Sequence, residues 1–125
     1  MTFPTDLSYT TDHEWIRTNG SCARVGVTSH ATEALGDIVY VSLPTVGAHV
    51  SPGDACAELE STKAVSAVYS PAPGVISAVN EAVAEAPETI GADPYQEGWL
   101  FEVDLEANLP VELMDATQYE RFVAE

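Results

Sequence analysis

Basic side chains are nearly absent from this sequence. Its 125 residues contain four Lys and Arg against 20 Asp and Glu, which gives a formal net charge of −16. Such a charge repels phosphate backbones and anionic lipid headgroups over at least a Debye length. We therefore expect neither nucleic acid nor a membrane surface as a partner. The acidity is about equally consistent with steering toward basic rims on partner proteins and with an origin in a generally acidic, salt-adapted proteome.

Cysteine is scarce too, and long apolar runs are missing. Cys22 and Cys56 form no CxxC pair and have no histidine at ligand spacing, so we predict neither a zinc site nor a redox dithiol. Isolated cysteines of this kind are most often small buried hydrophobes. The first residues lack a basic segment followed by an apolar run, and no segment approaches the length of a membrane span. We expect a soluble, cytoplasmic protein.

Motifs for catalysis are also missing. The sequence has no GxSxG elbow and no glycine-rich phosphate loop, and His30 and His49 lack partners at ligand spacing. Asp12, His13 and Glu14 are adjacent, but neighbouring side chains of an extended segment point to opposite faces, so we predict no metal site there. The sequence therefore favours a non-catalytic group carrier, in which an attached cofactor supplies the chemistry.

The one lysine of the chain, Lys63, lies between two segments with the alternation of strands. Residues 57–62 and 65–70 both follow a period of two, which predicts a hairpin with Lys63 at or near its tip. An amine at that position would stand in water, where an acylating enzyme could reach it. The alternative is an ordinary exposed turn lysine, which is common in proteins. Two features weigh against that alternative: the chain otherwise avoids lysine, and the STKA step around it is compact and has no other charge.

Turn and strand patterns elsewhere predict a mainly β protein with short helices. Asn19 and Gly20 separate two extended runs, so we expect a two-residue hairpin turn at these positions, both with positive φ. After a polar lead that precedes Glu14, we expect further strands over 37–44 (well buried), around Val50, over 75–79 and over 98–106, with Trp99, Phe101 and Val103 on one face. Short helices are expected over 29–36, capped by Thr28, and over 81–86, with residues 87–98 as a loop.

The last residues have a helical pattern. Asp115 and Gln118 form a capping pair, and apolar residues then recur at helical spacing: Ala116, Tyr119, Phe122 and Val123. We predict a helix over about 115–124 that packs by this stripe against the sheets. The chain is long enough for one hydrophobic core, so we expect a single domain over 1–125 with its core over 9–105.

Four stretches of the chain resemble the H proteins of the glycine cleavage system. They are YTTDHEW at 9–15, residues 25–47, residues 58–80 and DPYQEGWLFEV at 93–103. ESTKA resembles the family's ESxKA lipoylation step, with Lys63 matching the lipoylated lysine, while Gly91 and Ala67 depart from the usual Asn and the frequent acidic or polar residue. The resemblance implies a barrel-sandwich hybrid, the lipoyl/biotinyl-domain fold, extended by an N-terminal β-hairpin and a C-terminal helix.

The resemblance also implies a function. Lys63 would carry lipoic acid covalently and shuttle the aminomethyl group of glycine from the P protein (glycine decarboxylase) to the T protein (aminomethyltransferase). The L protein (dihydrolipoamide dehydrogenase) would reoxidise the arm. A lipoate ligase or a lipoyl or octanoyl transferase would attach the group, with Glu60 and Ala64 helping it to recognise the turn. Glu14 is placed by resemblance near a cleft for the arm; the alternative is a solvated carboxylate without a role.

Other functions remain open from the sequence. A biotinyl carrier would share the fold, but those domains resemble one another in a Met-Lys-Met step, whereas Thr62 and Ala64 flank this lysine. An H-like protein that relays lipoyl groups to other lipoyl domains, or a binding module that carries no cofactor, would fit the same pattern. The intact mass of protein from a native or lipoate-fed host separates carriers from a bare module.

Overall fold

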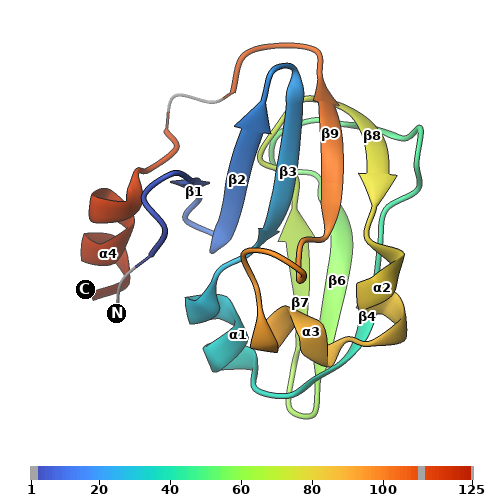
Figure 1. The fold of residues 1–125 in the computed structure, drawn as a ribbon, viewed down its shortest axis with the longest axis vertical. Helices are drawn as coiled ribbons and strands as arrows, with labels where there is room; N and C mark the ends of the chain where they lie inside the picture. The colour runs from blue at the N-terminus through green and yellow to red at the C-terminus, as the bar shows by residue number, and fades with distance from the viewer. Residues whose placement is uncertain (1–2, 110–111, 125) are drawn as a thin grey trace.

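The computed structural model describes residues 3–109 and 112–124, which form two β-sheets and four short helices (Figure 1). One sheet has six strands in the order β1-β2-β3-β9-β8-β5, and the other has three in the order β4-β6-β7. The strands are β1 Ser8–Tyr9, β2 Glu14–Asn19, β3 Cys22–Val27, β4 Ile38–Ser42, β5 His49–Val50, β6 Ala55–Ser61, β7 Val65–Tyr69, β8 Gly74–Val79 and β9 Phe101–Leu105. The helices are α1 Ser29–Leu35, α2 Glu81–Glu85, α3 Glu88–Ala92 and α4 Ala116–Ala124. The mainly β prediction is confirmed, and the two packed sheets agree with the expected barrel-sandwich hybrid.

Two clusters of buried side chains hold these layers together. The main core lies between the sheets and contains residues of both, among them Val25, Leu59 and Phe101. A second cluster joins the N-terminal segment to α4 and includes Phe3 and Leu7, each 4% exposed. The expectation of a polar lead is therefore wrong, because these two apolar side chains anchor residues 3–7 against the C-terminal helix. The division into a single domain with a core over 9–105 stays a prediction.

The C-terminal helix follows the predicted pattern. The Asp115 backbone N–H donates to the Gln118 side chain at 2.9 Å, and the Gln118 N–H donates to the Asp115 carboxylate at 2.8 Å, which is the reciprocal capping expected. Tyr119 is fully buried and stacks on Tyr9 with ring centroids 4.7 Å apart. Helix α1 is also confirmed, with Thr28 as its N-cap and Gly36 at φ 81° as its C-cap.

Three local predictions are corrected by the structure. The β2–β3 turn consists of Gly20 and Ser21, because Asn19 pairs with Cys22, and only Gly20, at φ 63°, has positive φ. A glycine at the first central position matches a type II′ turn, which also suits hairpin twist. Residues 88–92, expected within a loop, form α3. The expected buried strand is the edge strand β4, in which only two of five residues are buried.

Cys22 and Cys56 do not form a disulfide, and both are partly exposed. In the described part of the chain, no helix has the length and apolar character needed to cross a membrane.

Candidate functional site

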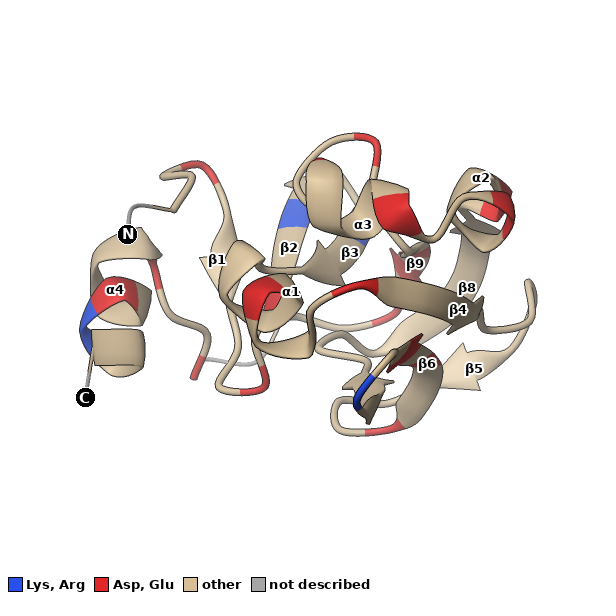
Figure 2. Ribbon diagram, turned by 90° about the horizontal axis from the view of Figure 1, so that it is seen from below, with Lys and Arg blue, Asp and Glu red and all other residues tan. Residues whose placement is uncertain are grey.

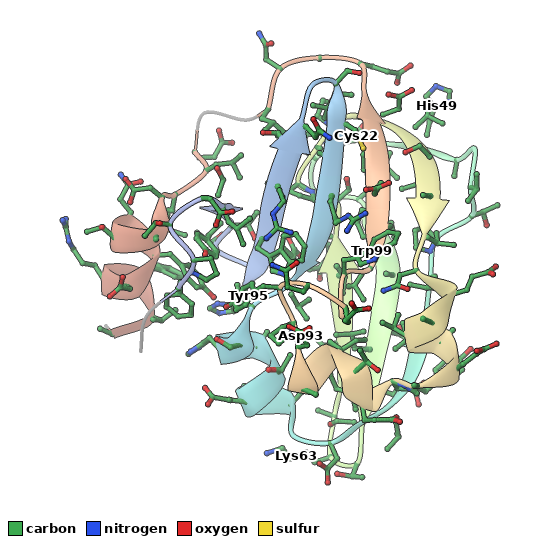
Figure 3. The ribbon with its side chains drawn as sticks, in the orientation of Figure 1. Cys22, His49, Lys63, Asp93, Tyr95 and Trp99 are labelled. Carbon is green, nitrogen blue, oxygen red and sulfur yellow. The ribbon has the colours of Figure 1, made fainter. Side chains whose placement is uncertain are left out.

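Lys63 lies in the turn between β6 and β7, as predicted, and its side chain is exposed (Figure 3). The backbone N–H of Ser61 donates to the carbonyl of Ala64 at 2.8 Å and closes the turn. The Ser61 Oγ accepts from the N–H of Lys63 at 3.2 Å and from the N–H of Ala64 at 3.0 Å. Ser61 thus satisfies the amides that the sheet leaves unpaired, and the turn has one defined conformation. The alternating pattern marked Ser61 as a strand residue and missed this role.

The turn is also fixed to the neighbouring α1–β4 connection. The Thr62 N–H donates to the Asp37 carbonyl at 3.2 Å. A Cβ at Gly36 would lie 3.4 Å from the Lys63 Cε and 3.8 Å from its Nζ, so the lysine side chain lies beside the C-terminal end of α1. Figure 2 colours the Lys and Arg segments blue: one lies in the turn beside β6 with acidic segments (red) near it, and the others lie on β2, β3 and α4. Lys63 is therefore a single cation on a supported turn, with its amine directed to solvent.

Glu14, the first residue of β2, is buried rather than solvated. Its side chain is 2% exposed, accepts from the Tyr69 N–H at 2.8 Å and accepts from the Thr10 hydroxyl at 3.0 Å. Burial raises the pKa of this carboxyl to about 7, the two hydrogen bonds oppose that rise, and the charge of Asp12 adds to it. The alternative of a solvated carboxylate is wrong.

Glu14 lines a pocket of about 150 Å³ on the side of the molecule where β2 meets the end of β7. Thr10, Tyr69 and Pro71 line it together with the exposed carboxylates of Asp12 and Glu112. Glu14 is the carboxylate of this lining that is withdrawn from water. Since a buried carboxylate with a raised pKa lacks the solvation that would stabilise its charge, a cation that enters the pocket would be stabilised beside it.

A tight bend before β2 places Glu14 in the pocket. The Thr10 N–H donates to the Glu14 carbonyl at 3.0 Å, and His13 adopts φ 67°, which reverses the chain. The Tyr119 hydroxyl of α4 lies 2.7 Å from His13 Nδ1 and 2.8 Å from Thr28 Oγ1. The C-terminal helix therefore supports the bend that positions Glu14, a role that its amphipathic pattern alone did not reveal.

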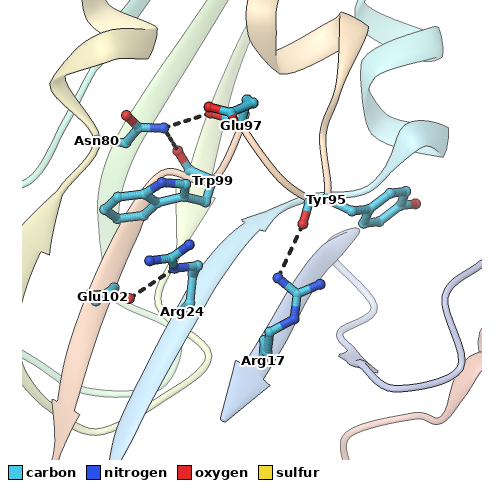
Figure 4. A network of polar contacts seen from close by, with 7 residues as sticks. All are labelled: Arg17, Arg24, Asn80, Tyr95, Glu97, Trp99 and Glu102. Carbon is cyan, nitrogen blue, oxygen red and sulfur yellow. Dashed lines mark hydrogen bonds and ion pairs between the residues drawn. The ribbon is translucent and has the colours of Figure 1, made fainter. Parts of the chain in front are cut away.

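The DPYQEGW stretch forms part of the scaffold. The Trp15 indole donates to the Pro94 carbonyl at 2.9 Å, and the Asn80 side chain donates to the carbonyls of Glu97 and Trp99 at 2.8 and 2.7 Å (Figure 4). The Arg24 guanidinium lies 4.3 Å from the Trp99 ring centroid. Trp99 is half-buried against the second cluster, so the prediction that it shares the core face of Phe101 and Val103 is wrong.

Lys63 and Glu14 are brought to one strand but not into contact. Lys63 lies two residues before Val65, the first residue of β7. Glu14 accepts a hydrogen bond from the N–H of Tyr69, the last residue of the same strand. Glu60 pairs with Val65 beside the turn, and Ala64 is exposed in the turn itself. Across the part of the chain that is described, no three His, Cys, Asp or Glu side chains are grouped so as to hold a metal ion.

Comparisons with known proteins agree on one family. Residues 7–125 match the glycine cleavage H-protein family. The glycine cleavage system H proteins of Beutenbergia cavernae and Thermobifida fusca are each 50% identical over 119 residues, which covers 95% of this chain and 94% of each relative. The crystal structure of a glycine cleavage system H protein from Mycobacterium marinum superposes with a TM-score of 0.91 at 47% identity, over 98% of this chain and 100% of that one. The chain belongs to the glycine cleavage H-protein family.

Proposed function

We propose that Lys63 is the lipoyl attachment site and that the chain carries the aminomethyl group of glycine within the glycine cleavage system. The family is the lipoyl carrier of that system. The observation that supports the site is the turn itself: the one lysine of the sequence stands exposed at a hairpin tip that Ser61 and the α1–β4 connection hold in place. These residues fit a covalently attached acyl arm, because the amine is accessible and its backbone is ordered.

Attachment is an acyl transfer to the Lys63 amine. The deprotonated Nζ attacks the carbonyl carbon of an activated lipoyl or octanoyl group, the new amide bond forms, and the adenylate or thiol leaves with its bonding electrons. The proton that Nζ loses passes to solvent. Attachment at Lys63 therefore removes one positive charge, so the formal net charge becomes one unit more negative than −16. An octanoyl group needs later sulfur insertion by another enzyme.

Once bound, the lipoyl group supplies a disulfide that can accept and release a one-carbon unit. The protein's own contribution is to tether that group and to offer the Glu14 pocket at the other end of β7. Lys63 and Tyr69 are six residues apart, which is no more than roughly 20 Å along the hairpin, so an acyl arm on Lys63 that extends along β7 is directed toward the pocket. An ammonium group in the pocket would pair with Glu14 and would lower its raised pKa, so that the carboxyl stays ionised. Ala67 provides no carboxylate along β7, which leaves this role to Glu14.

The partners follow from the same proposal. The P protein would load the group, the T protein would remove it to tetrahydrofolate, and the L protein would reoxidise the dithiol, while a lipoate ligase or a lipoyl or octanoyl transferase would modify Lys63. The chain is then a non-catalytic carrier. Glycine decarboxylation reconstituted with P protein and the acylated chain tests this: wild type is expected to support the reaction and Lys63→Arg is not. Activity of the Lys63→Arg protein at the wild-type level would contradict the proposal.

A second experiment tests the pocket. Acylated protein is loaded with glycine and P protein, and ammonia release is followed without T protein for wild type, Glu14→Gln and Glu112→Gln. A charge-assisted hydrogen bond contributes about 1.5 to 3 kcal/mol, so Glu14→Gln is expected to release ammonia roughly tenfold faster or more. Glu112→Gln removes an exposed carboxylate of the same pocket and should behave as wild type. Equal rates for all three proteins would show that Glu14 does not shelter the group.

A further inference from the structure

Exposed apolar side chains gather beside the lysine turn. Among the described residues, the large exposed hydrophobics are Val39, Tyr40, Val46 and Val65. Tyr40 and Val65 pair with Glu60 from its two sides, so these three residues form one row across the outer face of the β4-β6-β7 sheet. Val39 lies in the bulge that precedes Tyr40 in β4. Three of the four exposed hydrophobics thus lie at one corner of the molecule.

That corner adjoins the turn that holds Lys63. Val65 is two residues beyond Lys63, and Tyr40 is 54% and Val65 61% exposed. Single exposed apolar residues are normal on protein surfaces, but a contiguous group at one edge of a functional turn marks an interaction site. We propose that the row of Tyr40, Glu60 and Val65, here called the acylation face, is the surface on which the Lys63-acylating enzyme docks. This inference rests on the proposed function.

The position of the face selects this partner. The acylating enzyme forms a bond at Nζ, so its active site must come within bonding distance of the turn and its surface must cover the adjoining strands. Enzymes that act on the far end of a long arm can reach their target without touching the sheet. The acylation face therefore fits an enzyme that works at the lysine itself.

Charge defines the chemistry of that enzyme's surface. Glu58 lies two residues before Glu60 on the same side of β6. Asp37 is exposed beside the turn, where its backbone carbonyl accepts from the Thr62 N–H. The expected complement is an apolar depression for Tyr40 and Val65 with a rim of Lys or Arg. A second copy of this chain does not fit, because each copy has a formal net charge of −16.

Two closely matched valines test the proposal. Val65 and Val46 are 61% and 56% exposed, but Val46 lies in the β4–β5 connection, away from the turn. Val65→Thr and Val46→Thr both keep a β-branched side chain, and Tyr40→Thr removes the aromatic ring from the face. Each unacylated protein is titrated into a purified lipoate ligase with lipoic acid and ATP, and the initial rate of acylation is measured by intact mass. Thermal unfolding by circular dichroism confirms that each variant folds.

The expected result is a change in KM for the carrier with kcat unchanged. Tyr40→Thr should raise KM roughly tenfold and Val65→Thr about threefold, as for truncation at the centre of an interface, while Val46→Thr should equal wild type. Added salt should raise the wild-type KM, because the acidic rim contributes to docking. Unchanged KM in both face variants, or an equal effect in Val46→Thr, would overturn the inference. If KM changes instead for P protein with pre-acylated variants, the face belongs to that partner. A wild-type chain that acquires no acyl group would contradict the proposed function itself.

Discussion

Replacing Glu14 with Gln should make the protein more stable at high pH. The wild-type carboxyl has its pKa raised from 4.5 to about 7, chiefly by burial. Between these two pH values, the folded protein holds a proton that the unfolded chain has released, so the free energy of unfolding falls as pH rises. At about 1.4 kcal/mol per pH unit, the ionised carboxylate weakens the folded state by roughly 3 kcal/mol above pH 7, relative to its protonated form below pH 4.5.

The measurement is urea unfolding of wild type and Glu14→Gln at intervals from pH 4.5 to 8, followed by tryptophan fluorescence. Gln is neutral and of similar shape, and it can still accept from the Tyr69 N–H. Any effect of the substitution itself on the free energy of unfolding is therefore the same at each pH. Burial and the neighbouring His30 lower the pKa of His13, so the free energy of unfolding falls as the pH falls. Both proteins contain His13, so this effect cancels when their free energies of unfolding are compared. From pH 4.5 to pH 8, the free energy of unfolding of the variant should increase by about 3 kcal/mol relative to that of the wild type.

A difference between the two proteins that does not depend on pH would refute this reasoning. It would mean that Glu14 titrates alike in the folded and unfolded states, with the hydrogen bonds from Tyr69 and Thr10 offsetting the effect of burial on its pKa. Glu112→Gln, on the exposed rim of the same pocket, is the control and should follow the wild-type pH dependence.

Substitutions at three further positions test the local structure. Gly20→Val should cost about 1 to 3 kcal/mol by forcing a β-branched residue to φ 63°, whereas Gly20→Asn should cost less; equal melting temperatures for both would contradict the tight turn. Tyr119→Phe should cost about 1 to 3 kcal/mol, since it removes the hydroxyl shared by His13 and Thr28; an unchanged free energy of unfolding in urea would count against that network. Ser61→Ala leaves two turn amides without their acceptor and should slow acylation by lipoate ligase; a wild-type rate would show that the hydroxyl does not order the turn.

Local patterns predicted the elements whose signals lie within a few residues. The Lys63 hairpin and α1 followed from alternation and from the caps at Thr28 and Gly36, because each depends on neighbours in sequence. The Asn-Gly signal located the first hairpin but placed its turn one residue early, since hydrogen-bond register is a property of the paired strands. A short helix at 88–92 was hidden by Pro87 just before it and Gly91 within it, and it is stabilised by Ile90 in the core.

Long-range contacts account for what the sequence left unpredicted. The β-branched run of β4 resembles a buried strand, but the strand lies at a sheet edge with a bulge, and this exposes Val39 and Tyr40. Glu14 showed no sign of burial, because the amide that it accepts from belongs to Tyr69, 55 residues away. Resemblance alone directed attention to Glu14, and the fold supplies its physical setting.

The central claim is that Lys63, and no other residue, receives the lipoyl group. Wild-type protein and Lys63→Arg are each expressed with lipoate and its ligase, and their intact masses are compared. The account predicts an increase of one lipoyl group for wild type and no increase for Lys63→Arg, since no other lysine is present in the sequence. A lipoyl adduct on the Lys63→Arg protein, or none on the wild type, would contradict it.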